Sequence, residues 1–196
     1  MKYIAHRVNT AAGLAEVPRE YGVELDLRDR GDRLILNHDP FGDGEDFAEY
    51  LRGYAHSTLI LNVKSERIEW RVLELLKERG IKDYFFLDSS FPMVHALAEK
   101  GERNIALRFS EYEGLDTILA MKGRAAWVWV DCFTRIPLDR RSYAALKDAG
   151  FRLCFVSPEL QGRPQDIAPY RDQLRREGLA FDAVCTKLYN VPEWEK

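Results

Sequence analysis

Eight short apolar segments, separated by stretches of helical character, constrain the fold of this chain more than any other feature. Each has the length and the β-branched or aromatic content of a buried strand. Parallel strands need crossover connections, and eight strand–helix units close most economically into a (β/α)8 TIM barrel. An open, doubly wound sheet is the alternative. The eight segments are residues 3–5, 23–27, 59–63, 84–87, 104–109, 126–130, 151–156 and 181–185.

The segments between the expected strands have a helical period and glycine-marked ends. The clearest helix is expected over residues 66–79, where Ile68, Val72 and Leu76 fall on one face. Glycine ends helices readily because it adopts a left-handed backbone conformation without a Cβ clash. The glycines expected to close a helix are Gly22, Gly80, Gly101, Gly123, Gly150 and Gly178.

The chain length predicts one minimal barrel domain over residues 1–196, because 46% of the residues are apolar and no linker interrupts them. Residues 34–36 follow a turn-forming sequence and are expected to form a hairpin extension of the second strand. Only residues 188–196 follow the last strand, so we expect the final helix to be absent or replaced by a short tail.

Charge and hydropathy exclude several classes of partner. A net charge of −3 offers no broad basic surface for nucleic acid. No apolar run approaches the roughly 18 residues of a membrane helix, and the first residues lack a signal-peptide pattern, so we expect a cytoplasmic protein without stable membrane insertion. Cys132, Cys154 and Cys185 lie in or just after apolar runs without metal-binding spacing and are expected to be buried free thiols.

Glu24 and Asp26 are candidates for binding a cation. They lie two residues apart on one expected strand, so both side chains point to the same face. Two inward carboxylates repel each other unless a cation neutralises them, and Mg²⁺ or Ca²⁺ prefers such oxygen ligands. Alternatively, they form a solvated pair balanced by Arg28 or Arg30.

Asn62 and Lys64 repeat this two-residue spacing on the next strand. A polar residue inside an apolar run costs free energy unless it has a partner, and the amide oxygen of Asn62 could ligate the same cation. Lys64 then supplies positive charge for an anionic substrate, or else it pairs with Glu24 or Asp26. Polar residues that follow later strands include Asp88, Arg108, Asp131 and Lys187.

His6 and His38 follow the first strand and the hairpin. Imidazole titrates near neutral pH, so two such groups can divide general acid and general base work across one reacting phosphorus atom. Either residue can also be structural. Trp127 and Trp129 lie two apart on one strand and are expected to pack against a helix or in the barrel core.

Three segments together resemble a known family signature: Ile-Ala-His-Arg at residues 4–7, Gly-Val-Glu-Leu-Asp-Leu at 22–27 and Leu-Ile-Leu-Asn-His-Asp-Pro at 34–40. They resemble the glycerophosphodiester phosphodiesterase family, a (β/α)8 barrel family related to phosphatidylinositol-specific phospholipase C and spider-venom sphingomyelinase D. Beyond about residue 65 the resemblance rests only on strand count. The implied roles are His6 and His38 as the acid–base pair, Glu24 and Asp26 as metal ligands, and Arg7 and Lys64 as phosphate-binding groups.

The chain departs from the family pattern in three ways. Val8 stands where the family usually has glycine, and Asn62 replaces the usual third acidic metal ligand. A neutral amide weakens cation affinity, with Asp88 or Asp131 as possible compensation. Residues 38–62 are also too few for the small inserted subdomain of the family, so we expect that subdomain to be missing.

The resemblance and the residues lead us to expect a metal-dependent phosphoric diester hydrolase. Its substrate would be a glycerophosphodiester or a similar small or polymeric alcohol phosphodiester. The acidic balance favours a deacylated head group of lipid metabolism over an intact lipid. Two alternatives stay open. One is a lyase-like enzyme that releases a cyclic phosphate, and the other is a noncatalytic barrel that binds phosphate or a phosphodiester.

Overall fold

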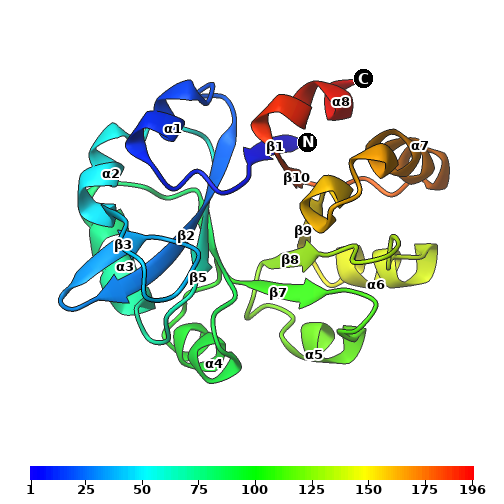
Figure 1. Ribbon diagram of the computed structural model, residues 1–196. Coiled ribbons are helices and arrows are strands. Elements are labelled where there is room, and N and C mark those ends of the chain that lie inside the picture. The colour runs from blue at the N-terminus through cyan, green and yellow to red at the C-terminus, as the bar shows by residue number, and fades with distance from the viewer.

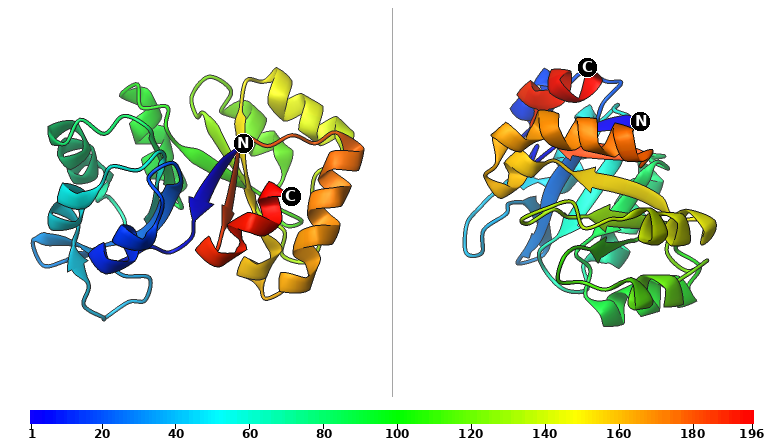
Figure 2. Two further views of the ribbon diagram at one scale, coloured as in Figure 1. Left: turned by 90° about the horizontal axis from the view of Figure 1, so that it is seen from above. Right: turned by 90° about the vertical axis from the view of Figure 1, so that its right-hand side faces the viewer.

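A computed structural model describes all 196 residues, which form a closed barrel with helices around it (Figures 1 and 2). The eight parallel strands are β1 (Lys2–Ala5), β2 (Gly22–Arg30), β5 (Leu59–Val63), β6 (Tyr84–Leu87), β7 (Ala106–Phe109), β8 (Trp127–Val130), β9 (Arg152–Val156) and β10 (Ala183–Thr186).

The barrel closes where β1 pairs with β10, which joins the two ends of the chain, and at a narrow contact between the consecutive strands β6 and β7. β1 pairs with both β2 and β10, and β5 continues the sheet from β2 to β6. Between β6 and β7 there is a single parallel bridge from Phe86 to Ile105, where the Phe86 N–H donates to the Asn104 carbonyl at 2.9 Å. The predicted barrel is therefore confirmed, and the open doubly wound sheet is wrong.

A helix follows each barrel strand before the next barrel strand begins. None of these helices has the length and apolar character needed to cross a membrane. In α3 the apolar face predicted from the sequence is buried at Val72 and Leu76. The helices are α1 (Ala11–Glu16), α2 (Phe47–Gly53), α3 (Glu69–Glu78), α4 (Phe91–Glu99), α5 (Leu115–Ala120), α6 (Arg140–Asp148), α7 (Ile167–Glu177) and α8 (Val191–Glu195).

Alternation along the strands separates the barrel interior from the layer beneath the helices. Inward apolar side chains fill the interior, and Phe85 stacks on Trp127 there with 4.5 Å between ring centroids. The Arg152 guanidinium lies over the Trp127 ring. Cys154 and Cys185 belong to the same cluster, and all three cysteines of the chain are free and buried, as expected.

The hairpin extension is present, and the inserted subdomain is missing. β3 (Arg33–Leu36) pairs antiparallel with the far end of β2, which runs beyond the barrel, and β4 (Glu45–Asp46) pairs with β3. Between β3 and β5 the chain contains only β4 and α2 as regular elements. Both expectations are confirmed.

The prediction that Gly22 closes a helix is wrong. Gly22 is the first residue of β2, and a Cβ there would lie 2.4 Å from both the Ile4 side chain and the Thr58 carbonyl oxygen. Close approach of neighbouring strands, rather than backbone conformation, requires glycine at this position. The other predicted helix-closing glycines have φ between 68° and 90°: Gly80, Gly101, Gly123, Gly150 and Gly178.

A short tail takes the place of a full final helix after β10, as one of the two expected outcomes, and this tail is itself partly helical. A 3-10 turn over Leu188–Asn190 leads into the five-residue α8, which lies beside the N-terminus in Figures 1 and 2. Trp194 of α8 is buried, its ring packs edge-on to Phe155, and its Nε1–H donates to the Ser157 hydroxyl at 2.8 Å. One buried tryptophan thus attaches the tail to the barrel.

We predict that Trp194→Ala lowers the free energy of unfolding by about 3 kcal/mol, because it empties a buried site and leaves the Ser157 hydroxyl without its donor. The matched control is Trp70→Ala, since the Trp70 side chain is 40% exposed and its loss should cost less than about 1 kcal/mol. Urea denaturation measures both variants. Equal losses in the two variants would show that α8 contributes nothing to stability.

Candidate active site

The inward polar positions of β1, β2 and β5 meet at the carboxyl ends of these strands. Glu24 and Asp26 point into the barrel from β2 and are only 1% exposed, and strand register sets Asp26 beside Asn62 of β5. A cavity of about 600 Å³ opens at the strand ends. The predicted site residues that line it are His6, Arg7, His38, Asn62 and Lys64.

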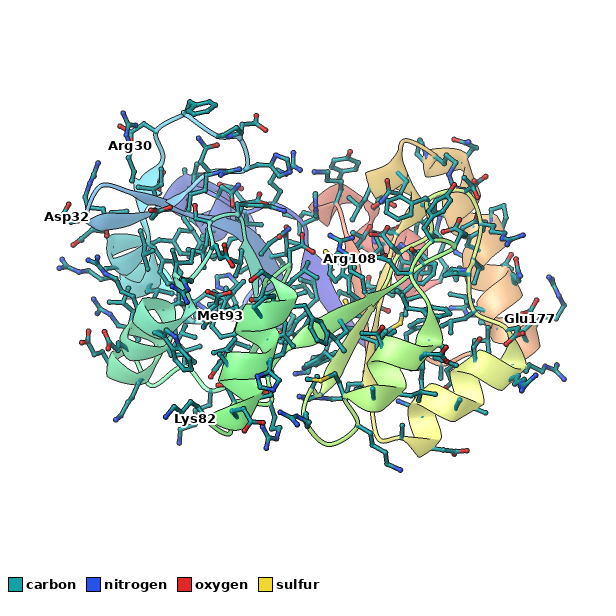
Figure 3. The ribbon with its side chains drawn as sticks, turned by 90° about the horizontal axis from the view of Figure 1, so that it is seen from below. Arg30, Asp32, Lys82, Met93, Arg108 and Glu177 are labelled. Carbon is teal, nitrogen blue, oxygen red and sulfur yellow. The ribbon has the colours of Figure 1, made fainter.

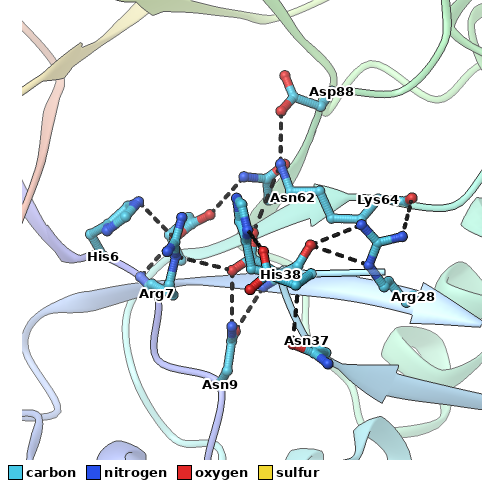
Figure 4. Close-up of polar contacts among 12 residues, drawn as sticks. His6, Arg7, Asn9, Arg28, Asn37, His38, Asn62, Lys64 and Asp88 are labelled. Atoms are coloured by element: carbon cyan, nitrogen blue, oxygen red, sulfur yellow. Dashed lines mark hydrogen bonds and ion pairs between the residues drawn. The ribbon is translucent and has the colours of Figure 1, made fainter. Parts of the chain in front are cut away.

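Glu24 is held by three groups at the carboxyl ends of the neighbouring strands, and these groups, His6, Arg7 and Asn62, are labelled in Figure 4. The Asn62 amide donates to its Oε1 at 2.9 Å, and the Arg7 backbone N–H donates to its Oε2 at 2.7 Å. His6 Nε2 lies 3.7 Å from the same oxygen. Burial, followed by the nearby charge of Asp26, raises the pKa of Glu24 to about 7. To present its N–H, Arg7 adopts a φ of 56°, which is uncommon for a residue with a side chain.

Asp26 has a different set of partners. Asn9 binds it twice, because its amide donates to Asp26 Oδ2 at 2.9 Å and its oxygen accepts from the Asp26 backbone N–H at 2.8 Å. Arg7 Nε lies 3.5 Å from Oδ2, and Lys64 Nζ lies 3.8 Å from Oδ1. No role is predicted for Asn9 from the sequence, although its position just after β1 and the cost of a buried carboxylate point to such a partner.

Arg28 and Arg30 do not balance the buried carboxylates, so that alternative is wrong. Arg28 donates to the His38 carbonyl through Nε and Nη2, and to the Lys64 carbonyl through Nη1 at 3.0 Å. Arg30 pairs with Asp43 at 2.8 Å. Arg28 therefore ties the loop that carries His38 to the end of β5.

His38 lines the same cavity as His6, as predicted, but its surroundings are more open. Its side chain is 40% exposed, and its Nδ1 lies 2.8 Å from Asp39 Oδ1 (Figure 4). This hydrogen bond is the main reason that the pKa of Asp39 is lowered. A carboxylate on Nδ1 orients the ring and leaves Nε2 for other contacts.

Lys187 is a site residue that the sequence identified only as a polar group after β10. Its ammonium lies 3.0 Å from His6 Nδ1. Because an ammonium only donates, Nδ1 must accept, and in the neutral ring Nε2 carries the proton that faces Glu24. Burial, followed by the charges of Lys187 and Arg7, lowers the pKa of His6 to about 3.

A chain of ion pairs crosses the cavity away from Asp26. Lys64 Nζ lies 3.2 Å from Asp88, and Arg108 binds both oxygens of Asp88, at 2.6 and 2.9 Å. Arg108 also donates to Asp131, which accepts from Gln161 at 2.7 Å. Figure 3 shows Arg108 near the middle of the molecule. Asp88 and Asp131 therefore engage Arg108 rather than compensating for the missing acid at position 62.

The residues around Asp26 suit a weakly held cation. Asp26 Oδ1 and Asn62 Oδ1 are buried without a hydrogen-bond partner, although their residues are neighbours in the sheet. Unpartnered buried oxygens are costly, and hard cations accept this type of ligand. No group of three or more His, Cys, Asp or Glu residues in the chain could hold a metal ion. A cation at this place would have two carboxylates and one amide oxygen as donors.

We predict that Asn9→Ala lowers the free energy of unfolding by about 1–3 kcal/mol, because it removes both hydrogen bonds that Asn9 makes to the buried Asp26. Asn37→Ala is the control, since the Asn37 amide donates to an exposed carbonyl group, that of Asp43. Urea denaturation under metal-free conditions compares the two. A loss for Asn9→Ala no larger than that for Asn37→Ala would mean that Asn9 does not support Asp26.

Comparison with known proteins places this architecture among solved structures. No protein-family model and no curated protein matches the sequence. A glycerophosphodiester phosphodiesterase from Agrobacterium tumefaciens matches over 100% of both chains, with a TM-score of 0.66 and 16% identity. A glycerophosphoryl diester phosphodiesterase from Parabacteroides distasonis matches 98% of this chain and 85% of its own, with a TM-score of 0.67 and 13% identity. The protein therefore has a TIM-like barrel fold similar to those of two glycerophosphodiester phosphodiesterases.

Proposed function

We propose that the protein is a metal-dependent phosphodiester hydrolase that acts on a glycerophosphodiester or a similar alcohol phosphodiester. The observation that carries this proposal is the cavity that His6 and His38 share, with the buried carboxylate of Glu24 3.7 Å from His6. Two imidazoles and a cluster of cations around one opening are the groups that phosphodiester cleavage needs. The fold likeness supports the same reaction class.

Arg7 and Lys64 are the proposed phosphate-binding groups. Both reach the cavity, and both lie at the long limit of ion-pair distance from Asp26, at 3.5 and 3.8 Å. The Arg7 charge is therefore available to an anion in the cavity, whereas Lys64 also binds Asp88 at 3.2 Å and would share its charge between Asp88 and the anion. A divalent cation, Mg²⁺ or Ca²⁺, held by Glu24, Asp26 and Asn62 would add positive charge beside the phosphoryl oxygens.

The two histidines are proposed to move the protons. A water or a neighbouring substrate hydroxyl forms the new P–O bond and loses its proton to one imidazole, while the other imidazole protonates the departing alkoxide. His6 Nδ1 is occupied by the Lys187 ammonium. His6 can accept a proton there once Lys187 turns toward the phosphate, so we propose that substrate binding frees His6.

A noncatalytic binding barrel is the second candidate, and one specific feature favours it. Asn62 supplies an amide where a third carboxylate would hold the cation more firmly, and its N–H already donates to Glu24. Such a site would bind a phosphodiester through Arg7 and Lys64 without turning it over.

We predict metal-dependent hydrolysis of glycerophosphodiesters or of bis-p-nitrophenyl phosphate, with activity lost in chelator. His6→Ala and His38→Ala should each reduce kcat/KM by about 100-fold or more, because each removes a proton-transfer group. His95→Ala is the control, since His95 is exposed on α4, and it should retain wild-type activity.

Phosphorus NMR of the products separates the candidates. A phosphomonoester as the first product supports hydrolysis by water, whereas a persistent cyclic phosphate supports the lyase-like reaction. Tight phosphodiester binding without any product would favour the noncatalytic barrel. Full activity in both His6→Ala and His38→Ala would contradict the proposed roles of the two histidines.

A further inference from the structure

The cavity at the barrel mouth has two unlike walls. On the side of β1, β2 and β5 it is lined by the ionic and polar groups described above. On the side of β7, β8 and β9 its lining combines four charged or polar side chains, Arg108, Glu113, Asp131 and Gln161, with five apolar or aromatic ones, which we call the aromatic wall. The members of this wall are Tyr112, Trp129, Phe133, Val156 and Leu160.

The rim of the aromatic wall is a pair of partly exposed rings. Tyr112 follows β7 and is 77% exposed, and Phe133 follows β8 and is 37% exposed. Their ring centroids lie 6.0 Å apart with the planes tilted by 45°. Aromatic rings arranged in this way still offer a face or an edge to a third ring.

The loops that carry these rings are fastened together by one carboxylate. Glu111 accepts hydrogen bonds from the backbone N–H groups of Phe133, Thr134 and Arg135, and from the Thr134 hydroxyl, at 2.7–3.2 Å. Burial alone would raise the pKa of Glu111, but these donors lower it to about 2. The rim pair is therefore organised before any ligand arrives, which reduces the entropy lost on binding.

The loop that carries Tyr112 has its own internal fastening. The Ser110 hydroxyl accepts from the Tyr112 backbone N–H at 3.1 Å and donates to Glu113 Oε2 at 2.7 Å. Tyr112 is thus exposed on a hydrogen-bonded turn.

The floor of the aromatic wall is apolar, and its polar groups are already paired. Trp129 is buried, and its Nε1–H donates to Asp131 at 3.3 Å. Asp131 is further bonded to Arg108 and Gln161. A hydroxyl-rich group packed against Val156 or Leu160 would lose its hydrogen bonds to water and gain none from these side chains. An aromatic ring has no such hydrogen bonds to lose.

We propose that the aromatic wall is the subsite for one alcohol group of the phosphodiester, and that it favours an alcohol bearing an aromatic ring over a small polyol such as glycerol. This inference rests on the proposed function, since it assigns the second half of the same cavity. With the phosphate between Arg7 and Lys64, one ester arm extends over the carboxyl ends of β7 and β8. The ring then lies against Tyr112 and Phe133.

The test uses two diesters of glycerol phosphate, one with 2-phenylethanol and one with glycerol. Both alcohols are primary and aliphatic, so their leaving abilities are similar and a difference in kcat/KM reports binding. Wild type should prefer the phenylethyl diester, and Tyr112→Ala or Phe133→Ala should lower the ratio of the two kcat/KM values about 5–10-fold. Tyr189→Ala is the control, because Tyr189 is 78% exposed and lies outside the cavity lining, and it should leave the ratio unchanged.

A binding measurement separates failure of this inference from failure of the proposed hydrolysis. Calorimetric titration of both diesters with Mg²⁺, in the His6→Ala background with and without Tyr112→Ala, needs no turnover. Tighter binding of the phenylethyl diester that Tyr112→Ala abolishes supports the subsite even if wild type shows no hydrolysis. Turnover of both diesters by wild type with a ratio that Tyr112→Ala and Phe133→Ala leave unchanged overturns the subsite alone. Equal affinities and no turnover overturn both proposals.

Discussion

The burial of two carboxylates inside the barrel is the constraint on which the rest of this site depends. Glu24 and Asp26 are 1% exposed and share one strand face, so the charge of Asp26 adds to the burial cost of charging Glu24. The groups that offset this cost come from outside β2. The backbone of Arg7 leaves its preferred conformation to reach Glu24, and Asn9 closes on Asp26 from the same segment. The hydrogen bonds that the two buried carboxylates require therefore set the backbone path of residues 7–9 after β1.

The other charged side chains at the cavity mouth are likewise arranged so that each carboxylate faces a cation. Lys64 lies between Asp26 and Asp88, and Arg108 continues the chain of alternating charges to Asp131. These ion pairs link side chains at the carboxyl ends of β5, β6, β7 and β8. The last of them, Asp131, also accepts a hydrogen bond from Trp129 of the aromatic wall. A ligand with one negative charge and one apolar arm complements such a mouth. Preorganised charges of this kind act most strongly where water is excluded.

The sequence predicts the barrel and most of the site because both depend on local periodicity. Alternation along the strands identifies the inward positions of Glu24, Asp26 and Asn62, and the structure brings them together. The sequence places Asn9 and Lys187 just after β1 and β10, but their partners lie 17 and 181 residues away, so periodicity along one strand does not identify which groups they contact. The prediction for Gly22 is wrong for a similar reason. Glycine is required there because Ile4 of β1 and Thr58, the residue before β5, approach its backbone closely.

The central claim is that the buried carboxylates and Asn62 form a cation site, and calorimetric titration of Ca²⁺ or Mg²⁺ into the protein tests it most directly. The account predicts one ion per chain in wild type and no binding in Glu24→Gln. It also predicts at least about tenfold tighter binding in Asn62→Asp, because ligand charge sets affinity at oxygen sites. Absence of binding in both wild type and Asn62→Asp, or equal affinity in wild type and Glu24→Gln, would contradict it.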